Sequence, residues 1–415
     1  QRMRRDGRSP TILWLLLPVG SLSAGAGVLT AVTVLAFGLS RDRRRDLVLC
    51  AGVAAANAPW IVAGLLHAGN ATADPVGAAV FALRGEGHLP EPLTAFGLGG
   101  IWNSEVVPVT REGALAVVSL VLVVVLLVAG QAAWRRTTPG RDQVAFLVCW
   151  GVGWGLAVAG WAAPDAAGWI GDHIPGGGLL RDGTRLLGLC ALVLATVVAH
   201  GAVRVAGAIR EREGRLLVTA LLGVVPLSFM PDAGWGASGS LRPVDYPASY
   251  QTVREVLGDV GGADVLVLPF SSYRAPSWNN GHKVLDPVGR YLIPDFVVSD
   301  DLVVSDRTVD GEDPRGAEVR RALGAGGPRE VSAELVDLGI GAVVVSRDAP
   351  GEFPRIAGEV VARTPELIAR RLEDVTVTRV SPWWRIAMGG AWMLYLLPGI
   401  LMGVLAGMRI LRRRV

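Results

Sequence analysis

Three charged residues stand within five positions at the start of a long apolar run, namely Arg181, Asp182 and Arg185. A guanidinium presents paired N–H donors that match a phosphate, and a neighbouring carboxylate can orient it. A charged group at the end of an apolar run must be satisfied by a partner, by water or by lipid head groups. The three residues therefore fit either phosphate binding at the mouth of a cavity or simple extension of charged side chains into the head groups.

A second group, Asn103, Glu105 and Arg111, lies in the connection 68–113. These side chains are candidates for lining the same cavity as Arg181. A loop carboxylate can serve as a general base for an acceptor hydroxyl, although most exposed loop acids have no such role.

A third group follows the apolar run 265–268. It mixes aromatic, amide and charged side chains, a combination that suits stacking on a sugar face and hydrogen bonding to it: Tyr273, Arg274, Trp278, Asn279 and Asp286. Loops after the carboxyl ends of strands are where α/β sheets usually bind ligands. The alternative is a structured loop whose tryptophan packs at an interface.

Long apolar runs must position these residues, and several reach the roughly 20 residues that a helix needs to cross the hydrocarbon core. Spanning helices are predicted at 47–67, 114–133, 143–163, 183–203, 216–230 and 386–408. The stretch 11–39 is too long for one simple crossing and is interrupted by Pro18 and Gly20. It predicts a tight or re-entrant hairpin, with one strongly tilted span as the alternative. Glycines in the run 143–163 predict close helix packing rather than a nucleotide loop.

Arginine clusters occur in every second connection and set the predicted topology. They lie at 41–45, 135–141, 204–215 and 409–414. Because short Arg-rich connections stay in the cytoplasm, loops 68–113 and 164–182 and the polar segment 231–385 are predicted on the extracytoplasmic side. The C-terminus is predicted to be cytoplasmic.

Composition predicts three parts: a polytopic transmembrane domain (1–230), a small extracytoplasmic α/β domain (231–385), and a C-terminal transmembrane helix with an Arg-rich cytoplasmic tail (386–415). The chain has 415 residues, of which 51% are hydrophobic, and a net charge of +3. Its basic residues lie at the predicted membrane edges, which argues against nucleic-acid binding.

Cysteine usage limits the chemistry of the polar segment. Cys50, Cys149 and Cys190 all fall in predicted spans, so neither a disulfide nor a cysteine metal site is expected in the segment 231–385. The sequence identifies no cofactor and leaves a divalent metal open.

Short apolar runs that alternate with helical patterns predict the α/β fold of the polar segment. Val265–Leu268 and Ala342–Val345 are expected to be strands of a largely parallel sheet, covered on both faces. Helices are expected at 249–257 and 333–338, and an alternating pattern at 375–378 predicts an edge strand.

Three stretches, Gly97–Asn103, Leu180–Arg185 and Val267–Arg274, resemble those of polytopic GT-C-type glycosyltransferases of actinobacterial type, the arabinofuranosyl- and mannosyltransferase-like proteins of envelope assembly. The resemblance implies transfer of a sugar from a polyprenyl-phosphate donor to an envelope glycan or lipid in the bacterial plasma membrane. Such enzymes generally carry their catalytic acid in the first extracytoplasmic loop. No Asp or Glu here matches that residue, so the resemblance implies the C-terminal portion of such an enzyme, or a relative without activity, and assigns no catalytic residue.

The alternative is a non-enzymatic protein, either an envelope-assembly scaffold or a lipid or glycan transporter. A transporter should carry internal repeats with interrupted helices in corresponding positions. The sequence contains no such repeat.

Overall fold

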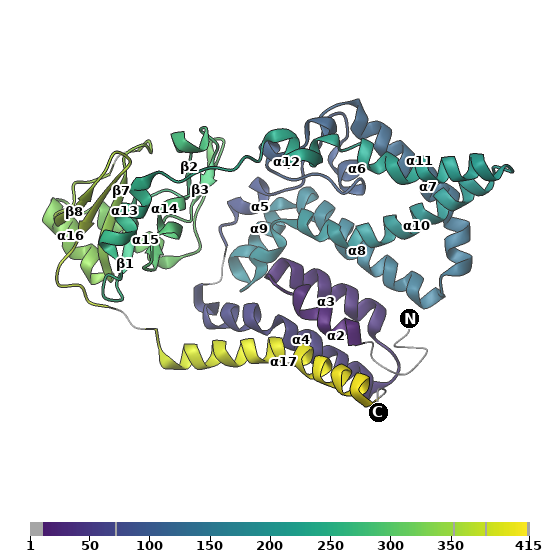
Figure 1. Ribbon diagram of the computed structural model, residues 1–415, viewed down its shortest axis with the longest axis horizontal. Helices are drawn as coiled ribbons and strands as arrows, with labels where there is room; N and C mark the ends of the chain where they lie inside the picture. The colour runs from purple at the N-terminus through teal and green to yellow at the C-terminus, as the bar shows by residue number, and fades with distance from the viewer. Residues whose placement is uncertain (1–10, 71–72, 352, 378–379, 413–415) are drawn as a thin grey trace. The chain divides into compact units, whose positions relative to one another are not determined.

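A computed structural model describes residues 11–70, 73–351, 353–377 and 380–412 (Figure 1). The chain divides into two compact units. Unit 1 joins Gln1–Leu241 to Pro382–Val415, and unit 2 is Arg242–Ser381. The segment 231–241, predicted to belong to the α/β domain, is thus part of unit 1.

Unit 1 is helical. Its α-helices are α2 (Thr11–Val19), α3 (Ala24–Gly38), α4 (Arg43–Leu66), α5 (Val76–Val80), α6 (Glu91–Phe96), α7 (Ala114–Thr137), α8 (Gly140–Ala162), α9 (Pro164–His173), α10 (Gly188–Gly207), α11 (Arg212–Ser228), α12 (Gly234–Gly239) and α17 (Pro382–Arg412). Short 3₁₀ turns lie between them: η1 (Ala68–Asn70), η2 (Ser104–Val106), η3 (Val109–Arg111), η4 (Gly177–Leu180), η5 (Gly183–Leu187) and η6 (Pro231–Ala233).

Five helices among the described residues are long and apolar enough to cross a membrane: Arg43–Leu66, Ala114–Thr137, Gly140–Ala162, Gly183–Gly207 and Pro382–Val404. They confirm five of the predicted runs and make the chain a multi-pass membrane protein. The run 216–230 belongs to a bent pair, Arg212–Leu227 and Pro231–Gly239, which turns by 64° and counts as a sixth span only if the pair is taken as one.

The stretch 11–39 forms two helices, α2 and α3, separated by a turn. At this turn Thr30 donates a hydrogen bond to the Gly20 carbonyl at 2.5 Å, and the Tyr395 hydroxyl of α17 donates to the Pro18 carbonyl at 2.7 Å. Ser23 accepts the Ala26 N–H and so caps α3. Side chains thus satisfy backbone groups that a break in a helix leaves open.

The contacts of α3 and α17 fix their directions. α3 runs opposite to α4, because Gly27 lies on Asn57 whereas Gly38 lies on Leu49. α17 also runs opposite to α4, because Trp384 near its start contacts His67 just after the end of α4, with ring centroids 4.9 Å apart.

α2 in turn runs opposite to α17, since Pro18 is bonded to Tyr395 and Trp14 lies beside Gly399. α3 and α17 both run opposite to α4, so they run in the same direction. Because α2 runs opposite to α17, it also runs opposite to α3. The result is a helical hairpin, as predicted for this stretch.

α7 and α10 pack through two glycines. A Cβ atom on Gly201 would lie 2.0 Å from the Leu126 carbonyl oxygen, and one on Gly130 would lie 2.2 Å from that of Val197. Only hydrogen in place of a side chain lets the two backbones approach this closely. Gly153 of α8 similarly faces the Leu186 carbonyl, whereas a Cβ on Gly151 meets nothing within 4 Å.

Unit 2 contains α13 (Ala248–Leu257), α14 (Pro287–Tyr291), α15 (Pro314–Leu323) and α16 (Pro328–Asp337), with the turn η7 (Ser277–Asn279). Its main sheet has the order β4 (Phe296–Val297), β1 (Asp264–Leu268), β7 (Ile340–Ser346), β9 (Leu367–Arg371) and β8 (Glu359–Arg363). Two small hairpins pair β2 (Tyr273–Arg274) with β3 (Val284–Leu285), and β5 (Leu302–Val304) with β6 (Arg307–Val309).

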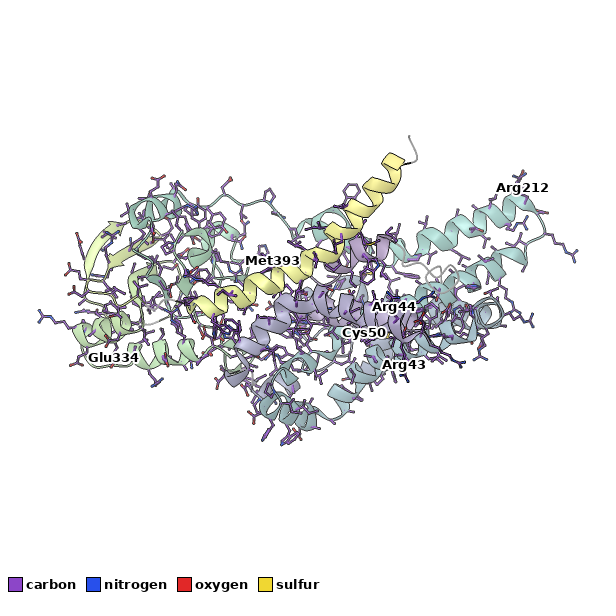
Figure 2. All side chains as sticks on the ribbon, turned by 90° about the horizontal axis from the view of Figure 1, so that it is seen from below. Arg43, Arg44, Cys50, Arg212, Glu334 and Met393 are labelled. Atoms are coloured by element: carbon purple, nitrogen blue, oxygen red, sulfur yellow. The ribbon has the colours of Figure 1, made fainter. Side chains whose placement is uncertain are left out.

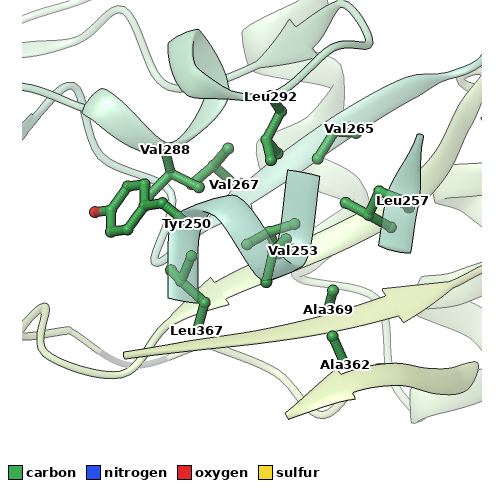
Figure 3. Packing of buried hydrophobic residues seen from close by; sticks show 12 residues of the cluster. Tyr250, Val253, Leu257, Val265, Val267, Val288, Leu292, Ala362, Leu367 and Ala369 are labelled. Carbon is green, nitrogen blue, oxygen red and sulfur yellow. The ribbon is translucent and has the colours of Figure 1, made fainter. Parts of the chain in front are cut away.

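The central strands are buried on both faces, as their uninterrupted apolar sequence predicts. Val265 and Val267 of β1 face Tyr250, Val253 and Leu257 of α13 (Figure 3). The alternate residues of β1 pack with apolar side chains of α15 and α16 on the other face: Leu266, Leu268, Val319, Ala322, Val331 and Leu335. Because successive side chains of a strand point to opposite faces of the sheet, the short strand β1 contributes residues to both hydrophobic cores of unit 2.

The structure confirms an α/β fold with strands at 265–268 and 342–345, and corrects two details of the prediction. β1 is parallel to β4 and β7, but β9 is antiparallel to β7, so the sheet is mixed. No strand occurs at 375–377, and Thr378 lies outside the described residues. Val375 instead packs partly buried on the core, while β8 lies at the edge of the sheet.

Candidate substrate site at the ends of the spanning helices

The connections 68–113 and 164–187 interlock at the same ends of α4, α7, α8 and α10. Ala73 donates a backbone hydrogen bond to Gly171 at 2.9 Å, and a Cβ on Gly168 would lie 2.8 Å from the Pro75 carbonyl oxygen. Trp154 of α8 donates to the Pro92 carbonyl at 3.2 Å. These contacts give charged residues from both loops a defined position.

Arg181, Asp182 and Arg185 lie at the entry to the span Gly183–Gly207. Asp182 is buried, and its carboxylate accepts hydrogen bonds from Arg185 Nε at 2.8 Å and from the Thr184 hydroxyl. The Arg185 side chain is 72% exposed, so this ion pair lies at the surface. Asp182 therefore orients Arg185 while bracing the first turn of the span.

The Arg181 guanidinium stacks over an aromatic ring from the other loop. Its central carbon lies 5.1 Å from the ring centroid of Phe81, and Phe81 packs edge-on against Trp102 at 5.0 Å. A cation held over a ring face is attracted by the ring's quadrupole, by about 0.5–1 kcal/mol at exposed sites. Arg181 is half-buried, and its contact with Phe81 fixes the direction of its side chain.

The glycines at 176–178 form a defined turn. Gly176 adopts a left-handed φ of +81°. Gly177 is buried, and a Cβ there would lie 2.2 Å from the Ile170 carbonyl oxygen. Glycine is needed here for a tight turn and a close approach to the end of α9.

Arg111 is engaged in a buried ion pair with Glu86, a residue that sequence analysis did not single out. Arg111 Nε contacts Glu86 Oε2, and Glu86 Oε1 accepts the Gly100 N–H at 2.6 Å. A Cβ on Gly99 would clash with both charged groups. The buried Glu86 carboxylate therefore binds two later parts of the same loop, the Gly100 backbone and the Arg111 side chain, and fixes the fold of residues 86–111.

Asn103 and Glu105 lie on the 3₁₀ turn η2. Asn103 Oδ1 accepts the Glu105 N–H at 3.0 Å, and the Glu105 side chain is exposed. Nearby, Asp232 accepts hydrogen bonds from the Thr110 N–H at 3.1 Å and its hydroxyl at 2.8 Å. This contact attaches the segment after α11 to the loop and explains why 231–241 belongs to unit 1.

In unit 2, Arg274 and Asp286 form a buried ion pair with 2.6 Å between Nε and Oδ2. Their side chains are 3% and 1% exposed. Arg274 also donates to the Pro269 carbonyl at 2.9 Å, and Asp286 accepts the Val288 N–H at 3.0 Å to cap α14. Burial raises the pKa of the Asp286 carboxyl, while the Arg274 guanidinium and the Val288 N–H act in the opposite direction. The pair holds the loop 269–286 and leaves neither charge at the surface for a ligand.

The other predicted sugar-contacting residues are more accessible. Trp278 is partly buried and packs with Tyr246 and Tyr250, at centroid distances of 4.8 and 5.7 Å. Tyr273 is exposed, and Asn279 donates its side-chain N–H to the His282 carbonyl at 3.2 Å. A sugar-binding role for these three residues stays a prediction.

The structure thus brings the 181–185 group against the loop that carries Trp102, Asn103 and Glu105. No group of three or more His, Cys, Asp or Glu side chains in the described parts of the chain is arranged to hold a metal ion. Glu86 and Asp232 were missed because their partners lie 25 and 122 residues away along the chain.

No family model and no curated protein matches this sequence. Solved structures of the arabinofuranosyltransferase AftD from mycobacteria are similar: one has a TM-score of 0.44 and 16% identity and covers 89% of this chain and 27% of that chain. Two classes of a mutant of that enzyme give TM-scores of 0.44 and 0.38, with 16% and 17% identity and coverage of 87% and 88% of this chain. This chain spans 27% to 30% of the length of those proteins. At this identity and TM-score, the likeness assigns no activity to it.

Proposed function

We propose that this chain is part of a membrane glycosyltransferase and helps bind a polyprenyl-phosphate sugar at the extracytoplasmic ends of its spanning helices. The sugar, an arabinofuranosyl or mannosyl unit, would pass to an envelope glycan or lipid. No catalytic residue within the chain is assigned.

The observation that carries this proposal is the placement of Arg181. Its guanidinium lies on Phe81 at the mouth of the span Gly183–Gly207, where the phosphate of a membrane lipid would lie. A guanidinium stacked on a ring has a fixed plane, and the paired N–H donors of a guanidinium match a phosphate in geometry. Low dielectric near the membrane strengthens such a contact.

Replacing Arg181 with alanine is expected to weaken binding of the lipid-linked donor. Hydrogen bonds to charged groups contribute about 1.5–3 kcal/mol, which corresponds to a loss of roughly ten- to a hundred-fold in affinity. The measurement is equilibrium binding of a labelled polyprenyl-phosphate sugar to purified protein in detergent or nanodiscs.

Arg84→Ala is the matched control, because Arg84 is an exposed arginine of the same pair of loops and is expected to tolerate the change. Both variants must show the wild-type elution profile. If Arg181→Ala binds the donor as tightly as wild type, the phosphate site is wrong and a scaffold becomes the better interpretation.

Unit 2 is expected to lie outside the cytoplasm. The arginine clusters at 204–215 and 409–414 flank the helices that lead into and out of it, and such clusters stay inside. In a Cys50→Ser background, Glu334→Cys on α16 should react with a membrane-impermeant thiol reagent in intact cells. Arg212→Cys at the start of α11 should react only after permeabilisation; both positions are exposed (Figure 2). The reverse pattern would contradict the topology.

A further inference from the structure

α9 and the turn after it present large apolar side chains at the molecular surface. Trp169 is 55% exposed, Ile174 and Leu179 are each 47% exposed, and Leu180 is 39% exposed. We call these four residues the apolar ledge. A compact group of this kind is costly in water and marks a surface that another apolar phase covers.

The opposite face of α9 is already occupied. Gly168 and Gly171 are buried and pack against the backbone of residues 73–75. Trp169 follows Gly168 by one helical position and therefore points away from this contact. Its ring stacks on His173 at 4.7 Å, with the planes 17° apart, so its direction is fixed.

The neighbouring apolar stretch Val76–Leu83 does not form this surface, because Ala78, Val80, Phe81 and Leu83 are buried. α5 packs on α9 and is covered by it. The exposed apolar surface belongs to α9 and η4 instead.

The ledge lies between two candidate spans. α8 ends at Ala162, and α9 begins at Pro164 after one residue with non-helical dihedral angles. Fourteen residues, 174–187, separate the end of α9 from the start of α10. They include the 3₁₀ turns η4 and η5, and the candidate span begins at Gly183. The ledge is thus connected on both sides to the ends of helices that are long and apolar enough to cross a membrane.

We propose that the apolar ledge inserts into the interfacial region of the bilayer, so that α9 lies on the membrane beside the candidate site. Tryptophan and histidine combine an apolar body with a polar edge, which suits them to this depth. Asp172 is exposed and contacts His173 at 3.4 Å, so apolar surface and charge meet at the C-terminal end of α9, as at a membrane–water interface. We take the lipid surface as the partner because the ledge adjoins, on both sides, helices that are long and apolar enough to cross a membrane. The inference is independent of donor binding by Arg181.

The test attaches a fluorophore to Ile174→Cys in the intact 415-residue chain carrying Cys50→Ser, reconstituted into phosphatidylcholine vesicles that contain brominated lipids. Fluorescence should fall more when the bromines lie near the carbonyl end of the acyl chains than when they lie near the chain ends. Leu179→Cys should behave in the same way, which guards against a local defect at one position.

Two reference positions set the scale. Val125→Cys, halfway along α7 and exposed on its side, should be quenched most by bromines near the chain ends, and Glu334→Cys of unit 2 should be quenched by neither lipid. If Ile174 and Leu179 behave like Glu334, or resist both the brominated lipids and aqueous iodide because protein covers them, the proposal is wrong.

Discussion

Replacing Gly201 with leucine is expected to prevent α10 from packing on α7. Even a Cβ at this position would lie 2.0 Å from the Leu126 carbonyl oxygen, and Gly130 makes the reciprocal approach to Val197. Backbone cannot move aside as a flexible side chain does, so the helices must separate. Overpacking typically costs about 1–3 kcal/mol, and we expect a value at or above the upper end of that range.

Thermal unfolding of unit 1, followed in the purified Cys50→Ser protein by reaction of the buried thiols of Cys149 and Cys190, would measure this effect, with Gly151→Leu on α8 as the matched control. A Cβ on Gly151 meets nothing within 4 Å, so the same change in residue volume should be tolerated there. Equal melting temperatures for the two variants would show that the close approach of α7 and α10 does not limit stability.

Asp286→Ala is expected to destabilise unit 2 by about 3–5 kcal/mol, because it leaves the buried Arg274 guanidinium without its charged partner. The substitution also removes the side chain that caps α14. This chain has two units, so a probe confined to unit 2 is needed. The rate of proteolytic cleavage within residues 242–381 reports opening of unit 2 itself.

Two variants sharpen this test. Arg320→Ala removes the partner of Asp301 in an exposed pair of the same unit and should cost about 0–1 kcal/mol. Combining Arg274→Met with Asp286→Leu replaces both charges by apolar groups and should restore much of the lost resistance, since no unpaired charge remains buried. If Asp286→Ala is cleaved no faster than Arg320→Ala, the ion pair does not hold the loop.

The strands and spanning helices that the sequence predicted are those specified by uninterrupted apolar runs. β1 and β7 belong to this class because both of their faces are buried. β8 and β9 were missed, since each carries arginine and only one side of each is well buried. The alternating residues 375–377 have strand propensity but no pairing partner, and strand formation depends on such context.

The exact starts of helices depend on proline and on side chains that cap the first turn, and the pattern of apolar residues does not reveal these. α16 begins at Pro328, ahead of the predicted start at 333, because proline suits the first turn and Glu330 accepts the Gly327 N–H at 3.0 Å. α4 likewise begins at Arg43, within an arginine cluster, where Asp42 accepts the Arg44 N–H at 3.1 Å.

The candidate site was predictable in its residue types and only partly in its geometry. Arg181 could be placed near a span end from the sequence, whereas its stacking on Phe81 depends on a contact between two loops. Arg274 and Asp286 looked like ligand contacts because their residue types suit a sugar. Sequence does not reveal that two charges twelve positions apart are buried against each other.

The hydrogen bond from Tyr395 to Pro18 has a consequence for biosynthesis. It joins residues 377 positions apart, so the turn between α2 and α3 acquires its last partner only when α17 has been made. At about 5–20 residues per second, synthesis of the intervening chain takes roughly 20–75 seconds. During that interval, the Pro18 carbonyl has only its local hydrogen bond from the Ser21 N–H at 2.9 Å, and the contact that joins the hairpin to α17 forms after Tyr395 has been made.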